Sequence, residues 1–278
     1  MIQYLLILLS STCAVAQSTL NKLGSNKGGV SPICFVFLKS FAAALLFFCL
    51  SIGSIAWHVP TVIYGLIYGG AMLFSNLFGY LALSKGSMAI TSLLASYSIV
   101  IPCVFGVAYF HEKLEWYKYL GLAILAISMF LLRKKDKTLK FEKGWGFCIA
   151  MTFLSNGVFY IVQKLHQARY PGLYCRELSL VATVFMSLMF LIIVLAKREK
   201  IPLKAMKFSM PSGALMGFAN FLSLVLSSVM NATVLFPLVT VSTVLLNCTV
   251  SKIMFKDKFS PLQILGIVLG VISVILMK

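Results

Sequence analysis

Two asparagines occupy matching places in the two halves of the chain. Asn76 opens the stretch NLFGYLALS and Asn220 opens NFLSLVLSS, so the motif recurs at an offset of 144 residues (76 to 220). A carboxamide donates and accepts hydrogen bonds at once, which suits it to hold a polar ligand between two related halves. The alternative is a hydrogen bond that only joins two helices, which contributes about 0.6 kcal/mol within a membrane. Both interpretations bury the two side chains.

Lys39 is the only lysine or arginine well inside an apolar segment. It follows Pro32 by seven residues, which at about 1.5 Å per residue places its backbone roughly 10 Å into the segment. A lysine at that depth can extend its ammonium group back to the polar boundary, or it can turn inward. An inward position would favour an anionic group on a ligand or make Lys39 a gating charge.

Four further polar side chains stand out by size and by depth in the apolar segments. The serines and threonines around them are common at contacts between apolar helices, so we interpret most of those as packing residues. The predicted binding residues are Asn76, Asn220, Lys39, Gln17, Asn156, Tyr97 and Asn247.

The remaining reactive residue types form no catalytic or metal-binding pattern. His58, His111 and His166 are expected in loops and make no HExxH motif or cluster. The seven cysteines all lie in apolar runs without a CxxC spacing, so we interpret them as small buried apolar residues. We therefore expect no enzyme activity, no cofactor and no metal site.

The composition defines the surroundings of these residues. Hydrophobic residues make up 60% of the chain and the mean hydropathy is +0.97, which is far outside the range of soluble proteins. The charged residues cluster between long apolar runs, as in an integral membrane protein. The formal charge of +17 comes without a recognition helix or an aromatic platform, so nucleic acid is not an expected partner.

Ten apolar runs have the length that a membrane helix needs, which is roughly 20 residues. The sequence therefore predicts an all-α integral membrane protein with ten transmembrane helices. Their expected limits are 3–21, 32–53, 60–83, 87–110, 116–132, 145–163, 174–196, 209–229, 232–253 and 261–277.

The chain also contains an internal repeat. The stretch HEKLEWYKYLGLAILAISMFLL from His111 corresponds to KDKFSPLQILGIVLGVISVILM from Lys256 at a constant offset of 145 residues (111 to 256). Each repeat then holds five helices, and because five is odd the second copy enters the membrane from the opposite side. The predicted architecture is two inverted five-helix repeats, which is typical of transporters.

The first run could instead be a secretory signal peptide, because it ends in Ala14, Val15 and Ala16. However, NKLG at Asn21 corresponds to QKLH at Gln163, so residues 3–22 match the internal segment 145–164. No basic residue precedes the apolar run either. We therefore expect the first run to be retained as a membrane helix.

These features resemble the drug/metabolite transporter superfamily, in particular its ten-helix EamA type. The resemblance rests on the acidic-basic pairs Glu112-Lys113 and Asp257-Lys258, on the helices of Gly121 and Gly266, on SLLASYSIVIPCVFG, and on the Lys22-Leu23 ending. It implies a first EamA-like repeat at 1–135, a basic linker at 136–143 and a second EamA-like repeat at 144–278.

The resemblance also implies alternating access around a central cavity. That cavity would be lined by the runs at 3–21, 60–83, 87–110, 145–163, 209–229 and 232–253. Many family members carry an arginine early in the second helix, where this chain has Lys39, and the corresponding region of the second half offers Ser179 or Val181.

The function expected from these features is secondary transport of a small metabolite such as an amino acid, organic anion, sugar, nucleoside or drug. A flippase-like carrier of a lipid-linked or amphipathic substrate is the alternative, and a non-transporting membrane scaffold is the third. All seven acidic residues lie in loops or at helix ends, which favours a facilitator or exchanger over proton coupling. The expected partners are the small-molecule substrate and membrane lipids, with the oligomeric state open and a monomer possible.

The distribution of positive charge predicts the orientation. Alternating spans assign 17 of the 24 lysines and arginines to one side and six to the side that holds both termini, with Lys39 inside a span. By the positive-inside rule both termini lie outside, although the resemblance favours termini inside. The short loops suggest a bacterial plasma membrane.

Overall fold

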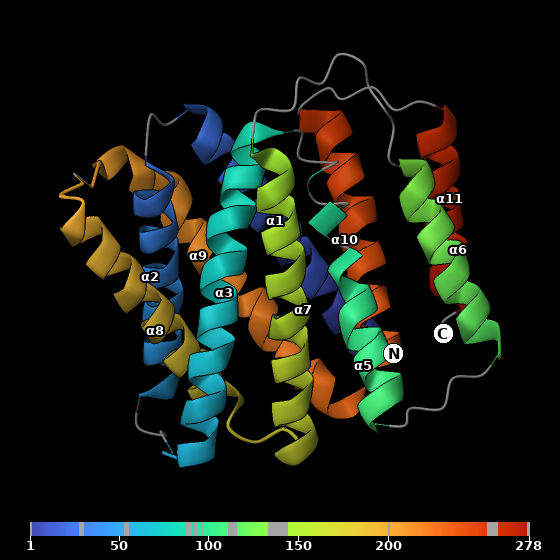
Figure 1. Cartoon of the computed structure of the whole chain (residues 1–278), viewed down its shortest axis with the longest axis horizontal. Coiled ribbons are helices and arrows are strands. Elements are labelled where there is room, and N and C mark those ends of the chain that lie inside the picture. Colours follow the sequence, from blue (N-terminus) through green and yellow to red (C-terminus); the bar gives the residue numbers. More distant parts are fainter. Residues whose placement is uncertain are drawn as a thin grey trace.

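The computed structural model of the chain describes residues 2–27, 31–52, 56–86, 91, 94–95, 97–110, 116–132, 144–199, 201–254 and 261–276. This described part is all-helical and contains no strand (Figure 1). Its helices, with the short 3-10 helix η1 among them, are α1 (Ile2–Lys27), α2 (Pro32–Ser51), α3 (Val59–Lys85), η1 (Tyr97–Ile99), α5 (Val100–Phe110), α6 (Trp116–Leu132), α7 (Trp145–Arg169), α8 (Cys175–Ala196), α9 (Leu203–Val229), α10 (Ala232–Met254) and α11 (Pro261–Leu276).

Seven of the described helices are long and apolar enough to cross a membrane, namely α1, α2, α3, α7, α8, α9 and α10. The helices α5, α6 and α11 have 11, 17 and 16 residues, below the roughly 20 that a straight span needs. The run expected at 87–110 is described only in part, and the predicted linker at 136–143 lies outside the described residues. The chain is therefore a multi-pass membrane protein, and its helix lengths support seven spans directly.

Three helices extend beyond the limits predicted from hydropathy. The first ends at Lys27, the sixth predicted run ends at Arg169, and the eighth begins at Leu203. Backbone hydrogen bonding continues past the apolar core because helices can run on into the polar boundary, where charged residues are tolerated. Pro211, two residues after the predicted start of the 209–229 run, consequently lies inside α9.

The expectation that His166 lies in a loop is wrong for the same reason. His166 is in the last turn of α7 and is fully buried. Its Nε2 lies 3.2 Å from the Thr61 hydroxyl and its Nδ1 lies 3.0 Å from the Gln167 amide nitrogen. Both ring nitrogens therefore have a polar neighbour, so the buried ring is accommodated within the protein.

Prolines and a glycine mark several helix starts. Pro32 and Pro261 are the first residues of α2 and α11, and Pro60 is the second of α3, positions where the missing N–H has no helical acceptor anyway. Gly144 precedes α7 with φ +88°, a left-handed conformation that only glycine adopts without strain. Pro102, which falls in the middle of the predicted 87–110 run, lies in the first turn of α5 because η1 precedes that helix.

The helices pack in a reciprocal pattern across the two halves of the chain (Figure 1). Helix α1 contacts α9 while α7 contacts α3, and α2 contacts α9 while α8 contacts α3. The helices α6 and α11 lie side by side at one edge of the bundle. An internal two-fold axis produces this kind of reciprocity, in which each element meets the counterpart of its neighbour.

Two glycines allow the closest of these helix contacts. A Cβ atom added to Gly69 of α3 would lie 2.7 Å from the carbonyl oxygen of Ala182 on α8. A Cβ atom added to Gly213 of α9 would lie 2.0 Å from the carbonyl oxygen of Lys39 on α2. Small residues let helix backbones approach closely where lipid provides no hydrophobic drive for packing. By these contacts Ala182 is the counterpart of Lys39 in the second half of the chain. It lies one residue after Val181, which the sequence suggested as a counterpart.

Large apolar side chains remain on the outside of the bundle. Examples are Phe48 on α2, Leu66 on α3, Ile192 on α8 and Phe130 on α6, which are 55%, 43%, 57% and 68% exposed. Outward apolar residues on most helices are expected of a protein whose surroundings are lipid.

Candidate functional site

Lys39 is the most deeply buried charged residue of the described part of the chain. It lies on α2, at the point where α9 comes closest, and its side chain is only 1% exposed. Its Nζ donates to Oδ1 of Asn76 on α3 over 2.6 Å. The ammonium group therefore turns inward and does not extend to the membrane boundary.

The carboxamide of Asn76 is held in place from its other end. Its Nδ2 donates to the carbonyl oxygen of Met72 one turn earlier over 2.8 Å, and it lies 3.8 Å from the sulfur of Met186. Because the amide nitrogen is engaged in this way, the amide oxygen faces Lys39. Asn76 thus joins α3 to α2 and also contacts α8.

A cavity of about 250 Å³ opens beside this pair. It is lined from both halves of the chain by α1, α2, α3, η1, residues 91 and 95, α7, α9 and α10. These are the six runs that the resemblance implied, with α2 added through Lys39. The lining residues of most polar character are Ser10, Gln17, Ser18, Asn21, Lys39, Ser75, Asn76, Tyr80, Thr91, Ser98, Thr152, Asn156, Tyr160, Asn220, Ser223, Thr240, Thr243 and Asn247.

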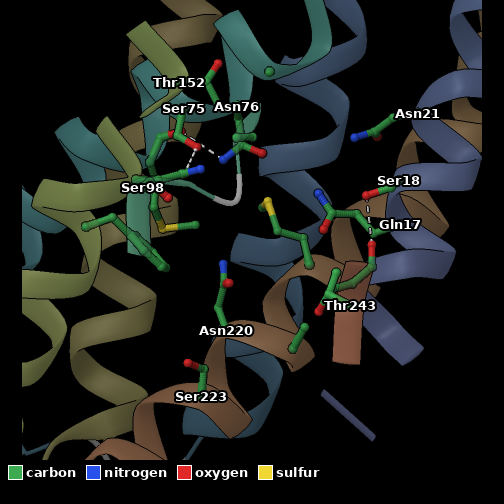
Figure 2. A pocket seen from close by; sticks show the side chains of 18 of the residues that line it. Gln17, Ser18, Asn21, Ser75, Asn76, Ser98, Thr152, Asn220, Ser223 and Thr243 are labelled. Atoms are coloured by element: carbon green, nitrogen blue, oxygen red, sulfur yellow. Dashed lines mark hydrogen bonds between the residues drawn. The ribbon is translucent and has the colours of Figure 1, made fainter. Parts of the chain in front are cut away.

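Six of the seven predicted binding residues line this cavity, and Figure 2 shows how several of them face it. Asn76 and Asn220 lie on opposite sides, and Gln17 of α1 lies beside them. Asn156 on α7 accepts a hydrogen bond from the Ser75 hydroxyl. Asn247 on α10 is 2% exposed. The seventh, Tyr97, belongs to η1, and its side chain lies outside the described residues.

Two of these side chains retain hydrogen-bonding capacity. Within the described residues, Oδ1 of Asn247 is buried without a hydrogen-bond partner. No side-chain hydrogen bond is recorded for Asn220 among the described residues either, although it lines the cavity. Buried polar groups in proteins are almost always paired. These amides are therefore available to a polar ligand.

The electrostatic character of the cavity is set by a single group. Among its described lining residues, Lys39 is the only one whose side chain can carry a positive charge, and no aspartate or glutamate is present. The other polar members are amides, hydroxyls and phenols, which donate and accept without net charge. The arrangement can bind a small polar molecule through many hydrogen bonds and one positive charge.

The sequence comparison missed several cavity residues, chiefly Asn21, Ser75 and Thr152. Asn21 accepts a hydrogen bond from the Ser212 hydroxyl over 2.7 Å, and its counterpart Gln163 donates to Ser223 over 3.0 Å. A helical pattern would have found them, since residues 10, 14, 17, 18 and 21 lie on one face of α1. The same spacing extends from Asn156 to Thr152.

Two lysines outside the cavity repeat one contact in both halves. Lys22 of α1 donates to the carbonyl oxygens of Leu83 and Gly86 at the end of α3 over 2.8 and 2.7 Å. Lys164 of α7 donates to the carbonyl oxygens of Ser227 and Met230 at the end of α9 over 3.3 and 2.8 Å. A cation at the carboxyl end of a helix pairs with carbonyls that have no helical donor.

The predicted acidic-basic pairs cannot be compared in the same way. Glu112-Lys113 and Asp257-Lys258 both lie outside the described residues. The described residues contain no group of three or more His, Cys, Asp or Glu side chains that could hold a metal ion.

The fold and the site together define a multi-pass helical membrane protein with a polar cavity inside the bundle. Residues 1–134, slightly less than half of the chain, match the model of the EamA-like transporter family. The resemblance to the drug/metabolite transporter superfamily is thereby confirmed. Members of the EamA family are transporters rather than enzymes.

Similarity outside the family model is limited to the fold. No curated protein matches the sequence. One solved structure, described only as the crystal structure of a protein, aligns with 98% of this chain and 97% of its own at a TM-score of 0.70 and 15% identity. The TM-score shows that the two chains share a fold, and an identity this low says nothing about the substrate.

Proposed function

We propose that this protein is a secondary transporter that carries a small polar metabolite by alternating access around the cavity. The observation that carries the proposal is the cavity itself, because polar side chains from both halves of the chain meet there at the depth of the membrane helices. Polar groups at that depth are costly and are retained mainly along substrate pathways. The match of residues 1–134 to the model of a transporter family supports the same function.

The proposal includes ten transmembrane helices in two inverted repeats, 1–135 and 144–278. The reciprocal helix contacts support it, and so do the matched lysines, because Leu83 and Ser227, and Gly86 and Met230, differ by the same 144 residues (83 to 227, 86 to 230). In this proposal the helices α5, α6 and α11 are the described parts of the fourth, fifth and tenth spans. Two opposed copies give a site that each half can close in turn.

The cavity volume favours a small solute over the lipid-linked alternative. A cavity of about 250 Å³ is close to the lower end of the roughly 300–1,000 Å³ that small-molecule sites span. An amino acid, a short organic acid or a similar metabolite has this size, whereas a lipid-linked sugar is several times larger. The absence of carboxylates from the described lining supports a facilitator or exchanger.

The cellular setting is part of the same proposal. We assign the protein to a plasma membrane with both termini outside, on the lysine and arginine count. Cysteines introduced near each end and labelled from one side only test this orientation. Labelling of both ends from the cytoplasmic side would reverse it.

Transport can be tested with one matched pair of variants on a single helix. Gly79 of α3 lines the cavity and has room for a side chain, since its nearest neighbour to an added Cβ is Thr152 at 3.7 Å. Gly70 of the same helix has no neighbour within 4 Å of an added Cβ. In proteoliposomes loaded with mixed metabolites, Gly79→Phe should abolish the release seen with the wild type, and Gly70→Phe should leave it unchanged. Release that is equal in both variants would contradict the proposed pathway.

A further inference from the structure

A buried lysine in this cavity lacks the kind of partner that usually accompanies a buried charge. Lys39 is 1% exposed, and within the described part of the chain its Nζ donates a hydrogen bond only to the amide oxygen of Asn76. An isolated charge in apolar surroundings costs far more free energy than a hydrogen bond to a neutral amide returns. Buried charges are therefore normally paired with an opposite charge.

Within the described residues, the two carboxylates are engaged elsewhere. Glu177 accepts a hydrogen bond from the backbone N–H of Ala56, which lies three residues before the start of α3. Glu199 follows α8, and one of its carboxylate oxygens lies 3.1 Å from the sulfur of Cys34 on α2. Neither residue lines the cavity, and none of the lining residues is acidic. Among the described residues, Lys39 therefore has a dipole as its partner and no countercharge.

The internal repeat makes this charge one-sided. The close contact of Gly213 with Lys39 in one half corresponds to that of Gly69 with Ala182 in the other. Ala182 is fully buried and carries no charge. The cavity consequently has a cationic end at α2 and α3, while its other walls offer the amides Asn220 and Asn247 and the aromatic residue Phe159.

From these observations we infer that the cargo is a small net anion whose carboxylate pairs with Lys39. The inference rests on the transport function proposed above and names its substrate class. A bound carboxylate accepts the hydrogen bond that Nζ of Lys39 otherwise donates to Oδ1 of Asn76. Its negative charge also neutralises the buried positive charge. A single lysine among amides suits one carboxylate better than a phosphate dianion, which is usually bound by several cations or by an arginine fork. The remaining donors and acceptors hold hydroxyl or amino groups of the same molecule.

Solutes of matched size that differ by one charge test this inference. The probe is a defined mixture of aspartate and asparagine, glycerate and serine, and lactate and alanine, with lysine as a cation. Proteoliposomes are loaded with the mixture, and the retained compounds are measured by mass spectrometry over time. Protein-free vesicles correct for leakage.

The wild type should release the more negative member of at least one pair tenfold or more faster than its partner. Lys39→Met should reduce this preference below twofold, and Lys39→Arg should retain it because the charge remains. Lys204→Met removes an exposed lysine at the start of α9 and should behave as the wild type. Melting curves of the purified variants establish that each one is folded.

The inference is overturned if neutral or cationic members leave wild-type vesicles as fast as the acids, or if Lys39→Met keeps the preference. Transport as such fails if no compound leaves faster than from protein-free vesicles. Thermal stabilisation of the detergent-solubilised protein by the same compounds then separates the two claims. Stabilisation by an acid but not by its neutral partner, lost in Lys39→Met, supports the anion site without transport, and the absence of any such stabilisation overturns it.

Discussion

The contact between Gly213 of α9 and the backbone of α2 provides a prediction whose size follows from distances. An added Cβ at residue 213 would lie 2.0 Å from the carbonyl oxygen of Lys39 and 2.9 Å from the Cβ of Ala42. Ordinary contacts begin at about 3.4 Å, so the two helices must separate by about 1.4 Å. Backbone atoms cannot rotate away as a side chain can, and α2 and α9 share one of the larger helix contacts.

Gly213→Ala should therefore destabilise the protein by about 3 kcal/mol, at the upper end of the usual cost of overpacking. The same change at Gly217, one turn later on the same face, meets only side-chain atoms of Phe47, Leu46 and Ala43 at 3.2 Å or more. It should cost about 1 kcal/mol or less. Because Gly213 contacts the residue that carries the buried ammonium group, the first variant should also weaken release of anionic solutes.

The counterpart in the other half gives an internal comparison. Gly69→Ala meets the carbonyl oxygen of Ala182 at 2.7 Å, which is 0.7 Å short of ordinary contact. Gly70→Ala meets nothing within 4 Å and should stabilise α3 by about 0.5–1 kcal/mol through helix propensity alone. Melting temperatures of the four purified variants should rank Gly213→Ala lowest, then Gly69→Ala, Gly217→Ala and Gly70→Ala. A melting temperature for Gly213→Ala equal to that of Gly217→Ala would refute the close approach.

Two further variants test contacts outside the cavity. Lys22→Met and Lys164→Met each leave two helix-end carbonyls without the ammonium donor. Each variant should lower the free energy of unfolding by about 1.5–3 kcal/mol, measured against Lys204→Met as an exposed control. Equal stability of all three variants would contradict the capping role. The hydrogen bond from Ser31 and that from Cys34 lower the pKa of Glu199, so the charged carboxylate stabilises the fold above the unfolded-state pKa and this contribution is lost as the pH falls through the folded-state pKa. Ser31→Ala should therefore have a slightly lower melting temperature than the wild type near neutral pH, by a small amount because the carboxylate is well solvated. The difference should vanish once the pH lies below the folded-state pKa of Glu199, and a difference that grows on acidification would reverse the sign.

The helix limits that sequence predicted best are those where an apolar run stops abruptly. The run expected at 174–196 is observed as Cys175–Ala196, because a turn precedes it and Lys197 follows it. The start of α9 was missed by six residues (203 against 209), since KAMKF mixes lysines with apolar residues and hydropathy averages them out. Hydropathy measures the apolar core of a span, whereas the helix ends where its hydrogen bonds end.

The candidate site was predictable where polarity and depth coincide. Large amides such as Asn76 and Asn220 are conspicuous in an apolar run, and both line the cavity. Ser75 and Thr152 were not singled out, because small hydroxyls are common at helix contacts as well as in binding sites. The direction of Lys39 was undecidable from its depth alone. It depends on the rotation of α2, which the contact with Gly213 fixes and which no local pattern encodes.

The pair formed by α6 and α11 offers a reference position for spectroscopy outside the cavity. Within the described residues, α6 packs chiefly on α11, and neither helix contributes a side chain to the cavity. Trp116 at the start of α6 is 76% exposed, which makes it a native fluorophore for quenching by lipid-borne groups. Spin labels on outward positions of this pair, read against labels on α1 or α9, would report the displacement of the cavity helices in ångströms without altering a residue that contacts cargo.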